Sequence, residues 1–517
     1  MKTAHYRYVL LVLAAYVVIT RFFMPFPADF EDSYIMQRYV QNGVDGYLFE
    51  WNRHFGTVQG TTGIAWLTLI SELARLTRFS VGAIDSYAGL GFAILALLAV
   101  YLAASGDLKL RNPRVAVLQL LPIATSPLFI RGSTNGLETS ITVFFTALSI
   151  YLLRFCNGAR GSSLCLGLFS GFTFLVRPDL PLFPVALFCS AFVLSPGALP
   201  QKGKAVLCLL LGTLAAAGAS LALAKILTGT ALPLSATLKV AIGDILLFRL
   251  PLSEYKYIAD QQLAFLGDVL PLVLLALIAT AFLDISSSRK YFPMYIASAA
   301  YYVYLFSVLP IMDIADRFQL PLLIGLSFAV PQFYEFACKF SKSDRHVTIV
   351  TGMVVILILL GNVAIFPDSR KEARFLASDH SDYAKIGYDL RGIDGLIIAS
   401  PEAGKLAAAS QQKFFDPIGL NDIFVAQNKT KPNYPAALSA YLHNTFGIPD
   451  VYIRRYETTD PPYSFLEIMP DFKALYRCND QENAERTGKT VCVYKDTVHA
   501  QQIITALGKS GIRVDLR

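Results

Sequence analysis

Long apolar stretches, separated by short polar segments, constrain the fold of this sequence more than any other feature. A helix needs roughly 17–25 apolar residues to cross the hydrocarbon core of a bilayer, and about eleven stretches reach or approach that length. They cover residues 7–25, 82–104, 114–130, 137–154, 162–177, 180–195, 205–227, 263–284, 291–309, 317–337 and 347–366. Because 54% of the residues are apolar and only 16% are charged, a water-soluble enzyme is disfavoured and a polytopic helix bundle is expected.

The basic residues between these stretches predict the orientation of the chain. They gather at every second connection, and short basic connections stay on the cytoplasmic side of a membrane. The groups are Lys2 with Arg7, Lys109 with Arg111 and Arg114, Arg154 with Arg160, Lys202 with Lys204, Arg289 with Lys290, and Lys339 with Lys342 and Arg345. The N-terminus is therefore predicted in the cytoplasm, and residues 367–517 outside it.

Residues 61–79 are apolar in part but are not counted as a membrane span. Their polar side chains recur along one stripe of a helix, at Thr68, Ser71, Glu72, Arg75 and Arg78. This pattern is typical of an amphipathic helix that lies in the membrane interface. If the segment crossed the membrane, every later basic connection would face outwards, so the topology depends on this interpretation.

The composition changes at about residue 367 to a mixed, polar one, over a length that suits one domain with its own core. Short apolar runs such as 396–399 alternate with helix-like segments such as 499–509, which indicates an α/β domain. The predicted fold class is thus mainly α. A membrane helix bundle over residues 1–366, with one helix beside the membrane, precedes a soluble α/β domain over residues 367–517.

Two of the seven cysteines, Cys478 and Cys492, fall in this C-terminal region. They flank a polar stretch, residues 479–489, between two apolar strand-like runs. The arrangement favours a disulfide that closes a hairpin in an oxidising compartment over two free thiols.

The predicted first external loop, residues 24–80, carries acidic side chains just where the first helix leaves the membrane. These are Asp29, Glu31 and Asp32. Closely spaced carboxylates act as general bases or bind a cation, although an acidic loop is by default only solvated. Arg38 and His54 belong to the same loop, and so rich a mixture of polar and aromatic groups suits a folded site better than a tether. For His54, a role as acid, base or phosphate contact competes with a structural hydrogen bond.

Further ionisable side chains stand beside helix ends in the later external loops. Glu138 begins the fourth stretch, where it either caps the helix or holds a functional charge. Arg177 is costly so close to the membrane without a partner, so it is either paired with Asp179 or reserved for an anionic ligand. The loops that follow contribute Lys239, Asp313 and Arg317. Taken singly, Lys239 and Arg317 are interfacial residues that keep their charges in water.

Carboxylates that face cations at an outer membrane surface suit the transfer of a sugar from a lipid-linked phosphate. The lipid tail lies between helices, cations hold the phosphate, and a carboxylate deprotonates an acceptor hydroxyl that attacks the anomeric carbon. This reaction needs no nucleotide, and residues 401–405 lack the upstream glycine and the hydroxyl residue of a phosphate-binding loop. Three carboxylates also suit a divalent cation, but the cationic partners favour a metal-independent enzyme that needs no cofactor.

Taken in order, these motifs resemble those of the GT-C membrane glycosyltransferases, which use polyprenyl-phosphate sugars. The branch most similar is a bacterial one, that of the mycobacterial terminal arabinofuranosyltransferases and the pilin arabinosyltransferases. The motifs are Glu31-Asp32-Ser33-Tyr34-Ile35 with Arg38-Tyr39, Gly136-Leu137-Glu138-Thr139, Arg177-Pro178-Asp179, Leu232-Pro233 with Lys239, Asp313 with Arg317 and Pro321, and Asp416-Pro417-Ile418-Gly419-Leu420-Asn421-Asp422. Two positions depart from that branch: Glu31 stands where it usually has Asp, and Leu234-Ser235 stand where Asn-Thr is expected.

The resemblance implies an inverting glycosyltransferase with its base among Glu31 and Asp32 and with a basic site for the lipid phosphate. It implies arabinofuranose as the sugar, a glycan or protein hydroxyl as the acceptor, and an external domain that helps to hold this acceptor. The expected location is the outer, periplasmic face of a bacterial inner membrane. The candidate substrate-binding residues are Asp29, Arg38, His54, Glu138, Arg177, Lys239, Asp313 and Arg317.

Two other classes of protein are alternatives. A transporter or flippase of lipid-linked sugars needs ionisable groups or broken helices at mid-membrane and often has inverted repeats, whereas the charged groups here concentrate in external loops. A membrane-anchored binding protein that acts through its external domain would not need acids and arginines together in separate loops. The net charge of +7 is modest and spread over connections, which argues against a nucleic-acid partner, and a monomer is expected.

Overall fold

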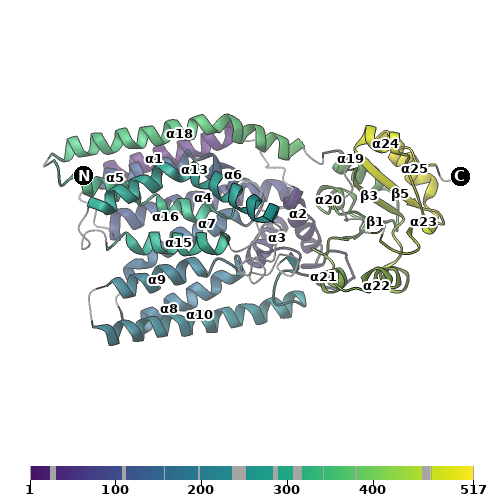
Figure 1. The fold of residues 1–517 in the computed structure, drawn as a ribbon, viewed down its shortest axis with the longest axis horizontal. Coiled ribbons are helices and arrows are strands. Elements are labelled where there is room, and N and C mark those ends of the chain that lie inside the picture. Colours follow the sequence, from purple (N-terminus) through teal and green to yellow (C-terminus); the bar gives the residue numbers. More distant parts are fainter. Residues whose placement is uncertain are drawn as a thin grey trace.

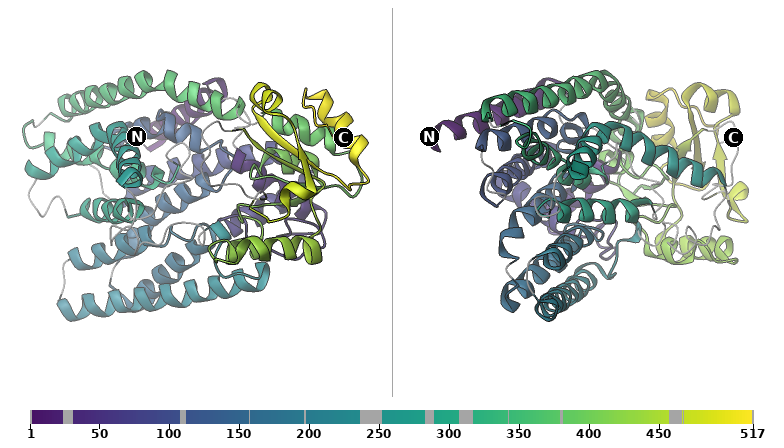
Figure 2. Two further views of the ribbon diagram at one scale, coloured as in Figure 1. Left: turned by 45° about the vertical axis from the view of Figure 1, so that its right-hand side comes forward. Right: turned by 60° about the vertical axis from the view of Figure 1, so that its left-hand side comes forward.

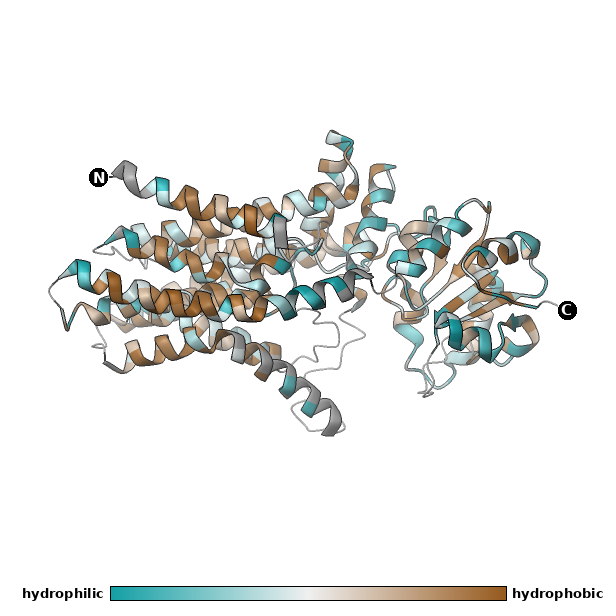
Figure 3. Cartoon of the chain, turned by 90° about the horizontal axis from the view of Figure 1, so that it is seen from above, coloured by the Kyte–Doolittle hydropathy of each residue, from teal (hydrophilic) through white to brown (hydrophobic). Residues whose placement is uncertain are grey.

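The structure, a computed structural model, describes residues 2–23, 31–107, 112–156, 158–195, 198–235, 252–282, 289–306, 317–341, 343–378, 381–456, 466 and 468–515. Its helices form an elongated bundle, and the C-terminal domain covers one end of that bundle (Figure 1). The N-terminus lies at the opposite end, and two further views show the same arrangement (Figure 2). Apolar residues dominate the bundle helices, whereas the C-terminal domain has a mixed hydropathy (Figure 3).

Each stretch predicted from hydropathy forms one helix or two consecutive ones. The helices are α1 (Lys2–Phe23), α4 (Val81–Leu102), α5 (Pro113–Ala124), α6 (Pro127–Gly132), α7 (Thr139–Leu152), α8 (Arg160–Phe172), α9 (Leu182–Leu194), α10 (Leu199–Thr228), α13 (Leu252–Phe282), α15 (Phe292–Phe306), α16 (Leu320–Leu326), α17 (Ala329–Ala337) and α18 (Asp344–Ser378). Among the described residues, 4 segments are long and apolar enough to cross a membrane: Val81–Gly106, Leu199–Thr228, Leu320–Ala337 and Asp344–Lys371. The total of about eleven crossings and their orientation stay predictions.

The predicted stretch 114–130 is split in two because Ser126 begins a new helix. Its side chain accepts the N–H of Phe129, and Pro127 occupies the first position of α6, where a missing N–H costs nothing. Asn362 of α18 donates to the backbone oxygen of Pro122 at 3.1 Å and so binds a carbonyl left over at the end of α5. The helix break is therefore held by a neighbouring helix.

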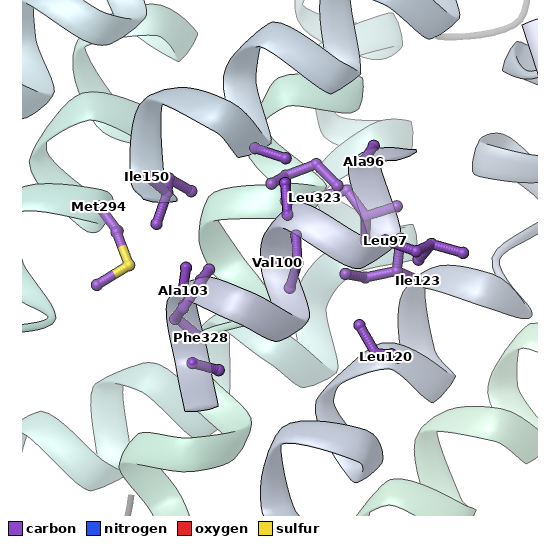
Figure 4. Packing of buried hydrophobic residues seen from close by; sticks show 14 of the residues in the cluster. Ala96, Leu97, Val100, Ala103, Leu120, Ile123, Ile150, Met294, Leu323 and Phe328 are labelled. Atoms are coloured by element: carbon purple, nitrogen blue, oxygen red, sulfur yellow. The ribbon is translucent and has the colours of Figure 1, made fainter. Parts of the chain in front are cut away.

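Apolar side chains from many helices form one core inside the bundle. Figure 4 shows Val100 of α4, Ile123 of α5, Ile150 of α7, Met294 of α15 and Leu323 of α16 in this core. In a bilayer such close packing, rather than exclusion of water, holds helices together. The core thereby positions the ends of α4, α7 and α16 that face the C-terminal domain.

Two helices of the first loop, α2 (Glu31–Val44) and α3 (Ile64–Thr77), lie between the bundle and the C-terminal domain (Figure 1). The helix predicted within residues 61–79 is thus present as α3, with Trp66 buried. Ser71, which was predicted on the polar stripe, is buried instead, because α3 packs against Gly43 of α2. The position of α3 relative to a membrane stays a prediction.

The α/β character of the C-terminal domain is confirmed. Its strands are β1 (Ile397–Ala399), β2 (Lys413–Phe415), β3 (Val451–Arg455), β4 (Tyr476–Cys478) and β5 (Lys489–Tyr494), in the sheet order β2-β1-β3-β5-β4. The pairs β2-β1 and β1-β3 are parallel, and the other two are antiparallel. The helices are α19 (Ser381–Leu390), α20 (Lys405–Ser410), α21 (Ile423–Asn428), α22 (Tyr434–Tyr441), α23 (Phe472–Leu475), α24 (Gln481–Thr487) and α25 (Ala500–Lys509). The boundary predicted at residue 366 falls inside α18, because the polar residues that follow continue the helix.

Alternate residues of the strands face two different cores. Ile453 on β3 belongs to a core that α2 and α3 share, whereas the neighbouring Tyr452 belongs to a separate core within the domain. The first loop and the C-terminal domain are consequently packed as one unit. At the edge of the sheet that β4 forms, Cys478 of β4 and Cys492 of β5 lie side by side. They form the disulfide that the sequence favoured.

Candidate active site

The two neighbouring acids at the start of α2 have different partners. Asp32 Oδ2 accepts a hydrogen bond from Arg317 Nη2 at 3.0 Å, and the two side chains are only 21% and 11% exposed. Glu31 Oε1 instead accepts the backbone N–H groups of Gly404 and Lys405, at 2.7 and 2.9 Å. Asp32 thus pairs with a cation from a distant loop, and Glu31 binds backbone N–H groups of the C-terminal domain.

Two arginines from distant loops contact the ring of Phe318. The Cζ atom of Arg177 lies 4.2 Å from the ring centroid, and that of Arg317 lies 4.9 Å from it. A guanidinium over an aromatic face is attracted by the negative face of the ring, and the attraction is stronger where water is excluded. Phe318 thus links the position of Arg317 to that of Arg177.

Arg177 is buried and forms a two-point ion pair with Asp179, with distances of 2.9 Å from Nε to Oδ1 and 3.1 Å from Nη2 to Oδ2. Tyr301 of α15 donates its hydroxyl to the same carboxylate at 2.6 Å. Burial acts to raise the pKa of Asp179, but the charge of Arg177 and the hydrogen bond from Tyr301 outweigh it and leave this pKa below its usual value. Of the two roles considered for Arg177, the structure shows the pairing with Asp179.

Glu138 occupies the residue before α7 but its side chain does not cap that helix. It accepts a hydrogen bond from the hydroxyl of Thr62 in the first loop, it is buried, and its charge acts on Arg177. Gly63 allows this approach, since a side chain there would contact both Glu138 and the backbone of Val176. The first loop, the start of α7 and the Arg177 segment therefore meet at one place.

Comparisons with known proteins agree with this architecture. No family model and no curated protein matches the sequence. Among solved structures, apo ArnT from Cupriavidus metallidurans is similar with a TM-score of 0.60 and 10% identity, over 95% of this chain and 98% of that one. The apo oligosaccharyltransferase of Archaeoglobus fulgidus is similar with a TM-score of 0.54 and 11% identity, over 92% of this chain and 73% of that one. This chain has the GT-C fold.

The GT-C fold predicted from the order of the motifs is thus confirmed over most of the chain. It brings Asp32, Arg177, Arg317 and Glu138 to the end of the bundle that the C-terminal domain covers. Three predicted site residues, Asp29, Lys239 and Asp313, lie outside the described residues.

Two other candidates, Arg38 and His54, contact other parts of the protein. Arg38 donates to the backbone oxygens of Ala407 and Gln412 at 2.5 and 2.7 Å, and to two groups of the first loop, so it fastens α2 to the C-terminal domain. His54 is exposed, and its ring packs against Tyr47. Substrate binding by both residues stays a prediction, and the hydrogen bonds of Arg38 give that residue a structural role as well.

Several residues around the site were missed from the sequence. Asp85 of α4 is 1% exposed and lies beside Ser33 of α2 and the left-handed turn at Gly136. An acid inside an apolar stretch is itself a signal of function, and this signal was available in the sequence. No local sequence pattern indicates a role for Phe318, Tyr301 or Gly404, because their partners are distant in the sequence. Within the described residues, no group of three or more His, Cys, Asp or Glu side chains is placed to hold a metal ion.

Proposed function

We propose that this protein is a membrane glycosyltransferase that moves a sugar from a polyprenyl-phosphate donor to a hydroxyl group of an acceptor. The observation that carries the proposal is the ion pair of Asp32 and Arg317, which joins a carboxylate and a guanidinium from distant loops. A base for the acceptor and a cation for the donor phosphate are the two groups that this reaction needs at one place.

In this mechanism Asp32 accepts the proton of the acceptor hydroxyl while the hydroxyl oxygen attacks the anomeric carbon of the sugar. The bond from that carbon to the phosphate oxygen breaks, and the lipid phosphate leaves with the bonding electrons. Arg317 stabilises the negative charge that develops on this phosphate, because charge-assisted hydrogen bonds from a guanidinium suit phosphate oxygens. Attack from the side opposite to the leaving group inverts the configuration of the sugar.

Two further charged groups, Arg177 and Glu31, have supporting roles in this proposal. Arg177 is neutralised by Asp179, so we assign it the positioning of Phe318 and, through this ring, of Arg317. Glu31 is assigned no proton transfer, since its carboxylate binds backbone N–H groups of the C-terminal domain. Phosphate binding by Lys239 stays a prediction.

An apolar cavity supports a lipid-linked donor. It has a volume of about 300 Å³ and lies among α5, α6, α13, α16 and α18, with Leu323 and Asn362 in its lining. Leu323 belongs to α16, the helix that begins shortly after Arg317, and the cavity suits a short part of an isoprenoid chain. Similar proteins have been solved with such lipids: ArnT with undecaprenyl phosphate, and the archaeal oligosaccharyltransferase AglB with a dolichol-phosphate and an inhibitory peptide.

The sequence motifs favour arabinofuranose as the sugar and a glycan or protein as the acceptor. We place the reaction at the outer face of a bacterial inner membrane, with the N-terminus in the cytoplasm and the C-terminal domain in the periplasm. The protein is proposed to act as a monomer.

The experiment that tests the proposal supplies purified protein in lipid with a panel of radiolabelled polyprenyl-phosphate sugars and with glycan or protein acceptors that carry free hydroxyl groups. Consumption of one donor with release of the lipid phosphate is expected, and the Asp32→Asn variant should consume it at least about 100-fold more slowly. A flippase would instead move a donor across the bilayer of a vesicle and leave it intact, and that result would refute the proposed transfer.

A further inference from the structure

One face of α2 lies along α20 of the C-terminal domain. Glu31, Tyr34, Arg38 and Gln41 follow each other at intervals of three or four residues, which places them on the same side of a helix. All four contact α20 or the residues that flank it. The contacts are the two N–H bonds to Glu31, the ammonium of Lys405 at 5.7 Å from the ring of Tyr34, the bond from Arg38 to Ala407, and the bond from Gln411 to Gln41 at 3.3 Å.

Gly404 makes the first of these contacts possible. A Cβ atom on Gly404 would overlap both the backbone oxygen and the carboxylate of Glu31. Because the first N–H groups of a helix have no partner inside that helix, the N–H groups of Gly404 and Lys405 are available to a carboxylate from another segment. Hydrogen bonds to an ionised carboxylate are also stronger than those between neutral groups.

Asp32 projects from a different side of the same helical turn. Successive residues of an α-helix are about 100° apart around the axis, so Glu31 and Asp32 reach different neighbours. Glu31 is held by the C-terminal domain, and Asp32 meets Arg317 of the bundle. The first turn of α2 is consequently fixed from both sides.

We propose that α20 and Gly404 act as positioning elements of the reaction, through Glu31. In this inference, which rests on the proposed function, the C-terminal domain does more than hold an acceptor. It fastens the first turn of α2 and thereby sets the direction in which Asp32 points. Glu31 is then a positioning residue, and a displacement of about 1 Å at the base is enough to lower a rate about 100-fold.

The test uses the full chain with the substitution Gly404→Ala, which pushes against Glu31 without removing an ionisable group. The expected result is a fall in kcat of about 100-fold with little change in the KM for the donor, and faster hydrogen exchange over residues 31–44. Gly392→Ala in the same domain is the matched control, because a Cβ atom there has open space around it. This control should match the wild type in both measurements.

Glu31 provides a second pair of variants, which also serves if Gly404→Ala does not fold. Glu31→Ala should reproduce the loss, whereas Glu31→Gln, which keeps an oxygen that accepts the two N–H groups, should recover a large part of the activity. Equal inactivity of the Gln and Ala variants would overturn a positioning role and make Glu31 a base. Full activity of Gly404→Ala or of Glu31→Ala, or unchanged hydrogen exchange in α2, would also overturn the inference.

The failure of the proposed function can be distinguished from the failure of this inference. A wild type that consumes no donor would refute the proposed function, and the hydrogen-exchange data would still decide whether α20 holds α2.

Discussion

Carboxylates are held in two different ways on the two sides of α2. Towards the C-terminal domain, Glu31, Asp416 and Asp422 accept backbone N–H groups. Towards the bundle, Asp32 and Asp179 each face a guanidinium, those of Arg317 and Arg177. The difference separates acids that shape the backbone from acids whose partners are charged side chains.

The partners of a carboxylate indicate whether it has a structural role or takes part in the reaction. A carboxylate that accepts several backbone N–H groups organises a turn or a helix end, as Asp416 does with Ile418, Gly419 and Asn421. Of the two carboxylates that face a guanidinium, Asp179 has both oxygens bound by Arg177 and Tyr301, whereas Asp32 binds Arg317 through one oxygen. Asp32 is therefore the better candidate for a reaction with a substrate. Substitutions in the two groups should therefore differ in their effects on activity and stability.

The largest effect is expected for Asp32→Asn. Removal of the base should lower the rate of sugar transfer by about 100-fold to 10,000-fold, the usual contribution of general base catalysis. The thermal unfolding temperature should fall less than in Asp179→Asn, because the Asp32–Arg317 pair is more exposed than the Arg177–Asp179 pair. Initial rates with a saturating donor measure the effect, and Asp45→Asn, a change at an exposed acid of the same loop, is the control. Equal rates in the two variants would remove the distinction between the two groups of acids.

Asp179→Asn should have its main effect on stability. The substitution leaves the buried guanidinium of Arg177 without its carboxylate, and breaking a buried pair in this way costs about 3–5 kcal/mol. Thermal unfolding in detergent, followed by tryptophan fluorescence, measures the loss. The matched control is Asp368→Asn, which removes the partner of Lys371 in a highly exposed pair and should cost less than about 1 kcal/mol. A similar loss in both variants would contradict the buried pairing.

An intermediate effect concerns the pH dependence of the C-terminal domain. Burial raises the pKa of Asp422 to about 6, against the bonds from Val425 and Tyr441, which lower it. The folded state therefore keeps a proton that the unfolded chain releases near pH 4, so the free energy of unfolding should fall as the pH rises from about 4 to about 6. The contribution of Asp422 is on the order of 2–3 kcal/mol.

Asp422→Asn tests this sign. An amide still caps α21 but does not titrate, so the decrease in unfolding free energy between pH 4 and pH 6 should become smaller. Burial raises the pKa of Asp416 as well, so part of the decrease should persist. Denaturant unfolding across this pH range measures the slope, and a slope that is the same in variant and wild type would disprove the role of Asp422.

The smallest effect is expected at Phe318. Phe318→Leu removes the aromatic face from Arg177 and Arg317, and each cation–π contact contributes about 0.5–2 kcal/mol. We expect weaker donor binding, seen as a several-fold rise in KM, and near wild-type behaviour for Phe318→Tyr. A Leu variant with unchanged KM would show that the ring does not position the donor-binding arginine.

Much of the fold was predictable because its signal is local. The length of an apolar stretch is enough to predict a helix, and short apolar runs that alternate with helix-like segments were enough to predict the α/β domain. The prediction was less accurate where a helix continues or breaks for reasons outside hydropathy. Ser126 divides one stretch into two helices by capping, and α18 runs on through polar residues past position 366.

The site was predictable only as a set of candidates. The acids of the first loop and the arginines of later loops were identified, and so was the choice of partners for Arg177. Asp85 was overlooked inside an apolar stretch, and the sequence did not indicate that Arg38 donates hydrogen bonds to Ala407 and Gln412. No pattern in the first loop indicates that Gly404 lies against Glu31.

The helical bundle, the α/β fold of the C-terminal domain and the kinds of charged residue near the bundle end could be predicted from the sequence, because helix formation and hydropathy depend on neighbours along the chain. Only the tertiary structure decided that Glu31 binds the C-terminal domain while Asp32 faces Arg317. The physical reason is that adjacent residues of a helix point about 100° apart, so their partners come from segments that only folding brings together.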